Sequence, residues 1–136
     1  MAGIGETTAI LRIWGDNLDP SEVTALLRCD PSESHTKGQQ IGTAERPRAA
    51  KTGAWRLSST KRIPGDLEDQ IVDLLSKVTS DIEVWNTITS RYEVDIFCGL
   101  FMAESNEGLS LSAKTLELLG NRGISIGLDI YDPTLE

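Results

Sequence analysis

The residues best suited to chemistry in this chain alternate along expected β-strands. Arg12 and Trp14 are two residues apart in one run, and Asp95 and Phe97 are two apart in another. Because successive residues of a strand point to opposite faces, residues two apart share a face. An arginine, a carboxylate and two aromatic rings on one face are typical of a surface that binds a ligand or a protein. The carboxylate and the arginine are also suited to acid–base chemistry.

Two further strands are expected to contribute to this face. Asp129 and Tyr131 alternate in the last strand, and Arg56 lies in a short strand, although the facing of Arg12 and Arg56 stays open. One interpretation is structural: an arginine pairs with a carboxylate across neighbouring strands while the aromatic rings shield the pair. The other is functional, and its binding residues are Arg12, Trp14, Arg56, Asp95, Phe97, Asp129 and Tyr131.

No established catalytic or metal-binding motif accompanies these residues. The sequence has no Gly-rich phosphate loop and no Gly-x-Ser-x-Gly turn. Its single histidine, His35, has no second histidine or cysteine pair nearby, so zinc lacks a set of ligands. We therefore expect no metal, no cofactor and no catalytic residue, and we expect His35 to be solvated in a polar loop.

The first element that must position the face is a strand over residues 8–14, followed by a helix over 20–29. Asp19 is a good N-cap, Pro20 suits the first helical position, and Glu22 stands where a capping box requires it. The chain thus begins with a strand, a tight turn and an amphipathic helix.

The remaining elements follow from apolar periodicity and turn residues. They are a loop over 30–53, a strand over 54–59, a helical region over 67–85 broken near 79, a strand over 91–103, a helix over 112–119 and a strand over 124–131. The pattern predicts a single α+β domain over 1–136. We expect a ferredoxin-like sandwich, with a four-stranded, mostly antiparallel sheet, helices on one face and a helical segment between two β-α-β halves.

Charge is distributed unevenly along the chain. The net charge is −8, which argues against a general nucleic-acid binder. Residues 28–62 hold eight basic and three acidic residues, a net charge of +5, so the rest of the chain carries −13. A long basic loop over 30–53 therefore accompanies an acidic body. The loop either folds against that body, stays mobile, or contacts phosphates or an acidic protein.

The compartment is indicated by what the chain lacks. No apolar run approaches the roughly 20 residues of a membrane span, and the first residues do not have the pattern of a secretory signal. Two cysteines, Cys29 and Cys98, are too few for a disulfide framework. We expect reduced cysteines and a cytoplasmic protein.

Four motifs resemble those of a bacterial family of small proteins, domain of unknown function family 4279. They are Gly15-Asp16-Asn17-Leu18-Asp19-Pro20, Trp55-Arg56-Leu57, the Leu-Ser-x-x-x-Leu helix start at Leu111, and Leu128-Asp129-Ile130-Tyr131. The resemblance covers roughly Ala9 to Tyr131 and implies no activity. The family usually has Pro-Thr and then Lys-Gly after the first helix. Here Pro31 precedes Ser32, and Lys37-Gly38 follows a longer loop.

Two functions remain open. The first is a small binding or interaction protein without catalysis, such as an immunity-type inhibitor. The alternative is a small enzyme that uses Asp95 or Asp129 with Arg12 in a pocket on the sheet face. A homodimer that buries this face would also explain its aromatic residues. A deep pocket with a converging carboxylate and arginine favours the enzyme, and a flat or covered face favours binding.

Finer expectations concern the last strand and the basic loop. Ile124, Ile126, Leu128 and Ile130 are expected to face the core. Asp129 lies between two of them, where a carboxylate requires compensation, and we expect an arginine such as Arg12 or Arg56 within salt-bridge reach. Residues 32–52 have few apolar anchors, so their backbone is expected to be exposed and quick to exchange its amide protons.

Overall fold

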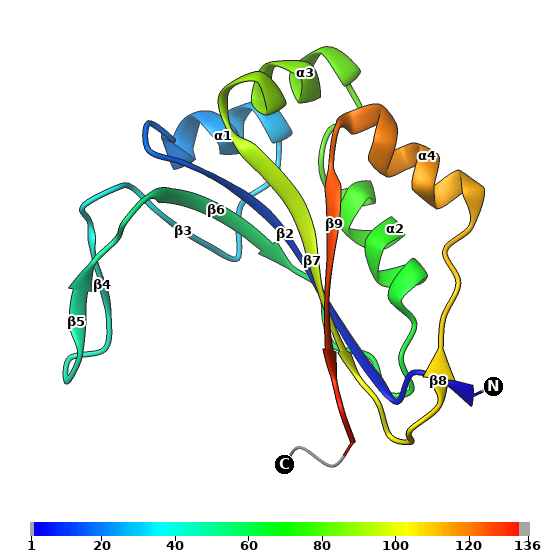
Figure 1. Cartoon of the computed structure of the whole chain (residues 1–136). Coiled ribbons are helices and arrows are strands. Elements are labelled where there is room, and N and C mark those ends of the chain that lie inside the picture. Colours follow the sequence, from blue (N-terminus) through cyan, green and yellow to red (C-terminus); the bar gives the residue numbers. More distant parts are fainter. Residues whose placement is uncertain (1, 134–136) are drawn as a thin grey trace.

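A five-stranded mixed sheet is the centre of the protein, as a computed structural model of residues 2–133 shows (Figure 1). Its strands in spatial order are β3 (Glu33–His35), β6 (Gly53–Ser58), β2 (Glu6–Gly15), β7 (Glu93–Phe101) and β9 (Ser125–Tyr131). β2 is antiparallel to both of its neighbours, and β9 is parallel to β7. The longest strand, β2, thus lies in the middle.

Four helices cover one face of this sheet (Figure 1). They are α1 (Pro20–Leu27), α2 (Leu67–Lys77), α3 (Ile82–Arg91) and α4 (Ala113–Arg122). Two small pairs complete the fold: β1 (Ala2–Gly3) with β8 (Glu107–Gly108), and the hairpin of β4 (Gln40–Gly42) and β5 (Pro47–Ala49). The α+β class predicted from the sequence is therefore confirmed.

Alternation along β2 creates the two faces of the sheet. Ala9, Leu11 and Ile13 are fully buried toward the helices, and the residues between them are only half-buried. Trp55 of β6 pairs with Ile13 and is also fully buried. Its indole N–H donates to the Thr24 hydroxyl at 3.0 Å, which satisfies the one polar atom of the ring inside the core.

The helix caps hold α1 and α3 in place. Asp19 caps α1 by accepting from the amide of Ser21 at 3.0 Å, and Asp81 caps α3 by accepting from Glu83. Glu22 was expected to complete a capping box, but its carboxylate accepts from Arg91 at the end of α3. A contact between two helices thus replaces a contact within one.

The expected four-stranded ferredoxin-like sheet is not confirmed. The second half, β7-α4-β9, is a β-α-β unit with parallel strands, as expected. In the first half, β6 is antiparallel to β2, and β3 is antiparallel to β6. β3 therefore runs in the direction of β2, and the first β-α-β unit is β2-α1-β3 with β6 inserted between its strands.

The segment expected to be a loop over 30–53 contains β3, β4 and β5. Backbone bonds join Gly38 to Ala50 and Ala50 to Gln39 at the base of the hairpin. Gly42 has a φ of +92°, and a Cβ there would come within 2.4 Å of the Arg46 carbonyl oxygen. Only glycine fits this turn without strain.

The expectation that the whole apolar side of β9 faces the core is wrong in part. Ile124, just before the strand, is buried and Ile126 is half-buried, but Leu128 and Ile130 are 50% and 58% exposed. β9 is the last strand of the sheet, so nothing pairs with its outer edge within residues 2–133. Leu128 and Ile130 lie on the helix side of this edge strand, and a side chain there is buried only where a helix packs over it.

A buried polar network joins α2 to β2. Gln70 is 1% exposed; its amide donates to the carbonyls of Thr7 and Thr60, each at 2.9 Å, and its oxygen accepts from the Thr7 hydroxyl at 2.6 Å. The same hydroxyl accepts from the Asp66 amide at 3.0 Å. Both polar atoms of the Gln70 side chain thus have partners, and their hydrogen bonds hold α2 against β2.

We expect Gln70→Ala to lower the free energy of unfolding by about 2–4 kcal/mol, because it removes three hydrogen bonds and leaves a cavity in the core. Val72→Ala on the exposed side of the same helix is the matched control and should change it by less than about 0.5 kcal/mol. Urea denaturation of both variants checks this. Equal stability of the two variants would contradict the role of the network.

Candidate functional site

The uncovered face of the sheet is centred on Arg12. Its guanidinium donates two hydrogen bonds to Asp95, from Nε to Oδ1 at 2.8 Å and from Nη2 to Oδ2 at 2.6 Å. These residues are direct neighbours in the register of β2 and β7. The predicted cross-strand pair is therefore present, and it forms between Arg12 and Asp95.

Two aromatic rings enclose the Arg12 guanidinium. Its central carbon lies 4.4 Å from the centre of the Phe97 ring and 5.2 Å from that of Trp14. Both rings are half-buried. A cation over aromatic faces gains electrostatic energy from the rings. The rings also shield the ion pair from water, and the pKa of Arg12 is raised, first by its hydrogen bond to Asp95.

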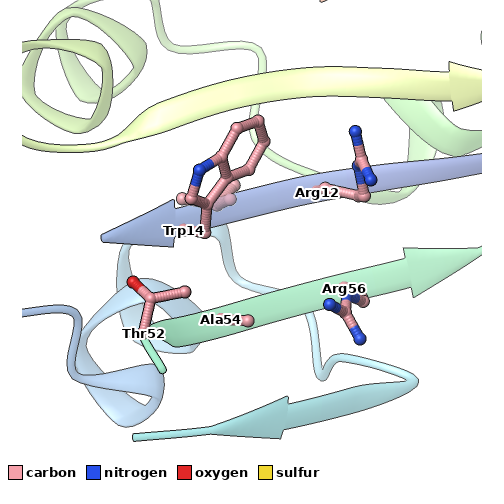
Figure 2. Close-up of a pocket in the computed structure, with 6 residues that line it drawn as sticks. Arg12, Trp14, Thr52, Ala54 and Arg56 are labelled. Carbon is pink, nitrogen blue, oxygen red and sulfur yellow. The ribbon is translucent and has the colours of Figure 1, made fainter. Parts of the chain in front are cut away.

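A shallow hollow adjoins this cluster on the side of β6. Arg56 lies directly across from Arg12 in the register, and Ala54 lies across from Trp14. Figure 2 shows Arg12 and Trp14 on β2 beside Ala54 and Arg56 on β6, with Thr52 just before that strand. The small side chain of Ala54 leaves room between the larger ones, and the hollow has a volume of about 200 Å³.

A second hollow of about 370 Å³ continues from the first, and the two share Thr52 and Arg56. Its wall includes Arg48 and Lys51 from the segment of the β4–β5 hairpin and Ile41 from β4. Its other residues are Glu33, His35 and Gly42. We call these two neighbouring spaces the sheet hollow and the hairpin hollow.

The last two predicted site residues form a separate cluster. Tyr131 stacks on Phe101 with ring centres 4.6 Å apart, and its hydroxyl donates to Asp129 at 2.6 Å. Asp129 is level with Gly99 in the register, four residues along β7 from Asp95, or about 13 Å at strand spacing.

The arginine expected beside Asp129 is not there: within residues 2–133 the carboxylate pairs with Tyr131. That pairing raises the pKa of the Tyr131 phenol, because hydrogen bonding to a carboxylate and the negative charge both favour the protonated form. The structure thus brings Arg12, Trp14, Arg56, Asp95 and Phe97 together and leaves Asp129 and Tyr131 apart.

The single histidine and the cysteines offer little reactivity. His35 lies in β3 and is 8% exposed, so the expectation of a solvated histidine is wrong. Cys98 lies in β7 with its side chain in the core. Burial raises the pKa of its thiol to about 12, far from the range of reactive thiolates. Among residues 2–133, no group of His, Cys, Asp or Glu side chains is arranged to hold a metal ion.

The arrangement around Arg12 is better suited to recognition than to catalysis. Both oxygens of Asp95 accept from Arg12, and its side chain is only 13% exposed. A general base requires a free oxygen within reach of a substrate proton. Arg56 is better placed to contact a ligand, because its bond to Glu33 lies at the surface and both side chains remain accessible.

Sequence reasoning missed the hairpin hollow. Arg48, Lys51, Thr52 and Ile41 were not among the expected site residues, although the net charge of +5 over residues 28–62 was visible. What could not be read was the folding of this segment into a hairpin beside β6. The sequence therefore showed that this segment is basic but not where its charges lie in the fold.

Comparison with known families supports the resemblance seen in the motifs. The profile described as "Domain of unknown function (DUF4279)" matches residues 5–133. The chain belongs to this family. No curated protein and no solved structure matches it significantly. Within residues 2–133, no helix is both long and apolar enough to cross a membrane.

A double-mutant cycle tests the pair at the centre of the site. We expect Arg12→Ala to lower the free energy of unfolding by about 2 kcal/mol, because it leaves the shielded Asp95 carboxylate without its partner. Asp95→Ala should cost less, since Arg12 can reach water. The double variant should show a coupling energy of about 1–2 kcal/mol in urea denaturation. Strictly additive effects would mean that the pair contributes nothing to stability.

Proposed function

We propose that the protein is a binding protein without catalysis and that its partner is another protein, held on the uncovered face around Arg12. The observation that carries this proposal is the cluster of Trp14, Arg12 and Phe97, which is fixed by Asp95 and which no helix of residues 2–133 covers (Figure 1). Aromatic and arginine side chains are enriched at protein interfaces. A guanidinium held by a carboxylate and two rings is also ordered before a partner arrives, which lowers the entropy lost on binding.

Three observations support binding over the alternative of an enzyme that uses Asp95 or Asp129 with Arg12. Each oxygen of Asp95 already accepts a hydrogen bond from Arg12, and Asp129 lies at the other end of the face. Neither Asp95 nor Asp129 lines the sheet hollow or the hairpin hollow, so the carboxylates that the enzyme would use do not face either space. A shallow surface beside rigid aromatic residues suits a protein contact.

We propose further that the protein works in the bacterial cytoplasm as an inhibitor of the immunity type. The free cysteines Cys29 and Cys98 support a reducing compartment. The comparison with immunity proteins rests on size and charge: 136 residues and a net charge of −8. The same charge supports a protein partner over a nucleic acid.

Selection from a displayed library of short random peptides on the intact protein tests the proposed site. We expect enriched peptides whose affinity falls by roughly tenfold or more with Trp14→Ala, the loss typical of an aromatic residue central to an interface. Leu116→Ala, on the exposed side of α4, is the control and should leave affinity unchanged. Circular dichroism confirms that both variants fold. Peptides that bind equally well to the Trp14 variant would place binding elsewhere and reject the site.

Self-association is a second candidate, favoured by the free edge of β9. Leu128 and Ile130 are exposed beside unpaired backbone groups of this edge strand, an arrangement that invites another strand. If two copies paired antiparallel about Leu128, Ile130 would oppose Ile126 and Asp129 would oppose Gly127. This register continues the apolar stripe and keeps the two Asp129 carboxylates from direct opposition, so the edge is complementary to itself.

Analytical ultracentrifugation tests this second candidate. We expect the mass to rise with concentration toward twice the 14.8 kDa of one chain. Leu128→Lys should keep the protein monomeric, because it places a charge where two copies of the residue would meet. Leu116→Lys on α4 is the matched control and should leave association unchanged. A wild-type protein that stays monomeric at every concentration would reject the β9 dimer.

A further inference from the structure

The cations of the β4–β5 hairpin have no acidic partners among the residues that the structure describes. Arg46, Arg48 and Lys51 are exposed, and none of them forms an ion pair among residues 2–133. Other cations do find partners; for example, Arg62 pairs with Asp69, and Lys37 pairs with Asp16. Arg28, Lys61, Lys114 and Arg122 also form no ion pair among residues 2–133, so what distinguishes the hairpin is that three unpaired cations lie within six residues of one another.

This cluster of cations is informative because acidic residues are abundant elsewhere in the chain. The chain outside residues 28–62 carries a net charge of −13. A basic segment on such a protein could neutralise itself by folding against the acidic body, which was one expectation from the sequence. Instead the hairpin projects beyond the edge of the sheet, away from the helices (Figure 1). Its charges stay available to a group outside the chain.

The hairpin hollow gathers part of this charge into a concave site. Arg48, Lys51 and Arg56 line it together with one carboxylate, that of Glu33. Glu33 pairs with Arg56 at 3.1 Å, so it neutralises one of the three cations. Arg48 and Lys51 supply the remaining excess, and Ile41 adds an apolar wall. An anionic group is the complementary ligand.

The hairpin hollow also continues into the sheet hollow. Thr52 and Arg56 line both spaces, so one extended ligand can cross from one to the other. Such a ligand would place an aromatic or aliphatic side chain beside Trp14 and its acidic groups beside Arg48 and Lys51. The chemistry of the two hollows is therefore complementary to a mixed segment, apolar at one end and acidic at the other.

We infer that the hairpin hollow anchors a short acidic segment of the protein partner, with two or more Asp or Glu residues next to an apolar one. This inference rests on the proposed function and names the chemistry of the partner. The net charge of −8 disfavours a long polyanion such as a nucleic acid, whose phosphates would extend over the acidic body. A short acidic segment carries its charge only where Arg48 and Lys51 meet it.

Selection of displayed peptides tests the inference through two charge-reversed proteins. Peptides selected on the wild type should be enriched in Asp and Glu beside an aromatic or aliphatic residue. Their affinity should fall by roughly tenfold or more with Arg48→Glu/Lys51→Glu, and it should also fall as salt screens the charges. Arg46→Glu/Lys114→Glu is the matched control: it changes the net charge equally, but neither residue lines the hollow. It should lower affinity far less.

The outcomes separate this inference from the proposed function. Peptides that depend on Trp14, lack acidic enrichment and bind equally to Arg48→Glu/Lys51→Glu would overturn the acidic anchor and leave the binding site standing. A library without Trp14-dependent peptides would reject both. Inorganic phosphate or tripolyphosphate that competes with every selected peptide and shifts the amide signals of Arg48 and Lys51 would assign the hollow to phosphate and overturn the inference. Recovery of affinity between the charge-reversed protein and Lys-substituted peptides would confirm direct pairing.

Discussion

The rest of the structure depends on the burial of one face of β2. Ala9, Leu11 and Ile13 face the helices and are fully buried. β6 and β7 both pair with β2 along this stretch, one on each side. Because side chains alternate along a strand, this burial forces Ile10, Arg12 and Trp14 onto the opposite face. All four helices contribute buried side chains to a single core, so the arginine and the indole remain on the uncovered side. The surface that we assign to binding is thus the geometric consequence of the core.

Arg12 shows how the uncovered face remains compatible with a stable fold. An arginine in the middle of a central strand requires a carboxylate, and the register places Asp95 directly across from it. Trp14 and Phe97 then contact the guanidinium from two sides, so the aromatic surface is held in place by the same charge. A structural ion pair and a prepared interface are not competing explanations here. The pair orders the rings, and ordered rings lose less entropy when a partner binds.

The sequence predicted the elements that have strong local patterns and missed those set by distant neighbours. The strand that became β7 was readable from its apolar alternation, and a pair between an arginine and a carboxylate on neighbouring strands was expected, but the choice of Arg12 and Asp95 needed the register of the sheet. β3 was missed because its three polar residues carry no apolar alternation, and it becomes a strand only by pairing with β6. The exposure of Leu128 and the tyrosine partner of Asp129 depend on the position of β9 at the edge of the sheet. No local pattern contains that information.

The missed hairpin and the uneven charge are parts of one arrangement. β6 lies between β2 and β3, and the chain that connects β3 to β6, residues 36–52, lies outside the five-stranded sheet. No helix of residues 2–133 covers this segment (Figure 1). Polar and charged side chains are the stable choice for such a segment, and acidic ones would serve solubility equally well in a protein of this net charge. Arg46, Arg48 and Lys51 are basic instead, and they stand unpaired within residues 2–133. Solvation alone explains charge in this hairpin but not its sign, and the acidic segment that we infer as a ligand would account for the positive charge of Arg48 and Lys51.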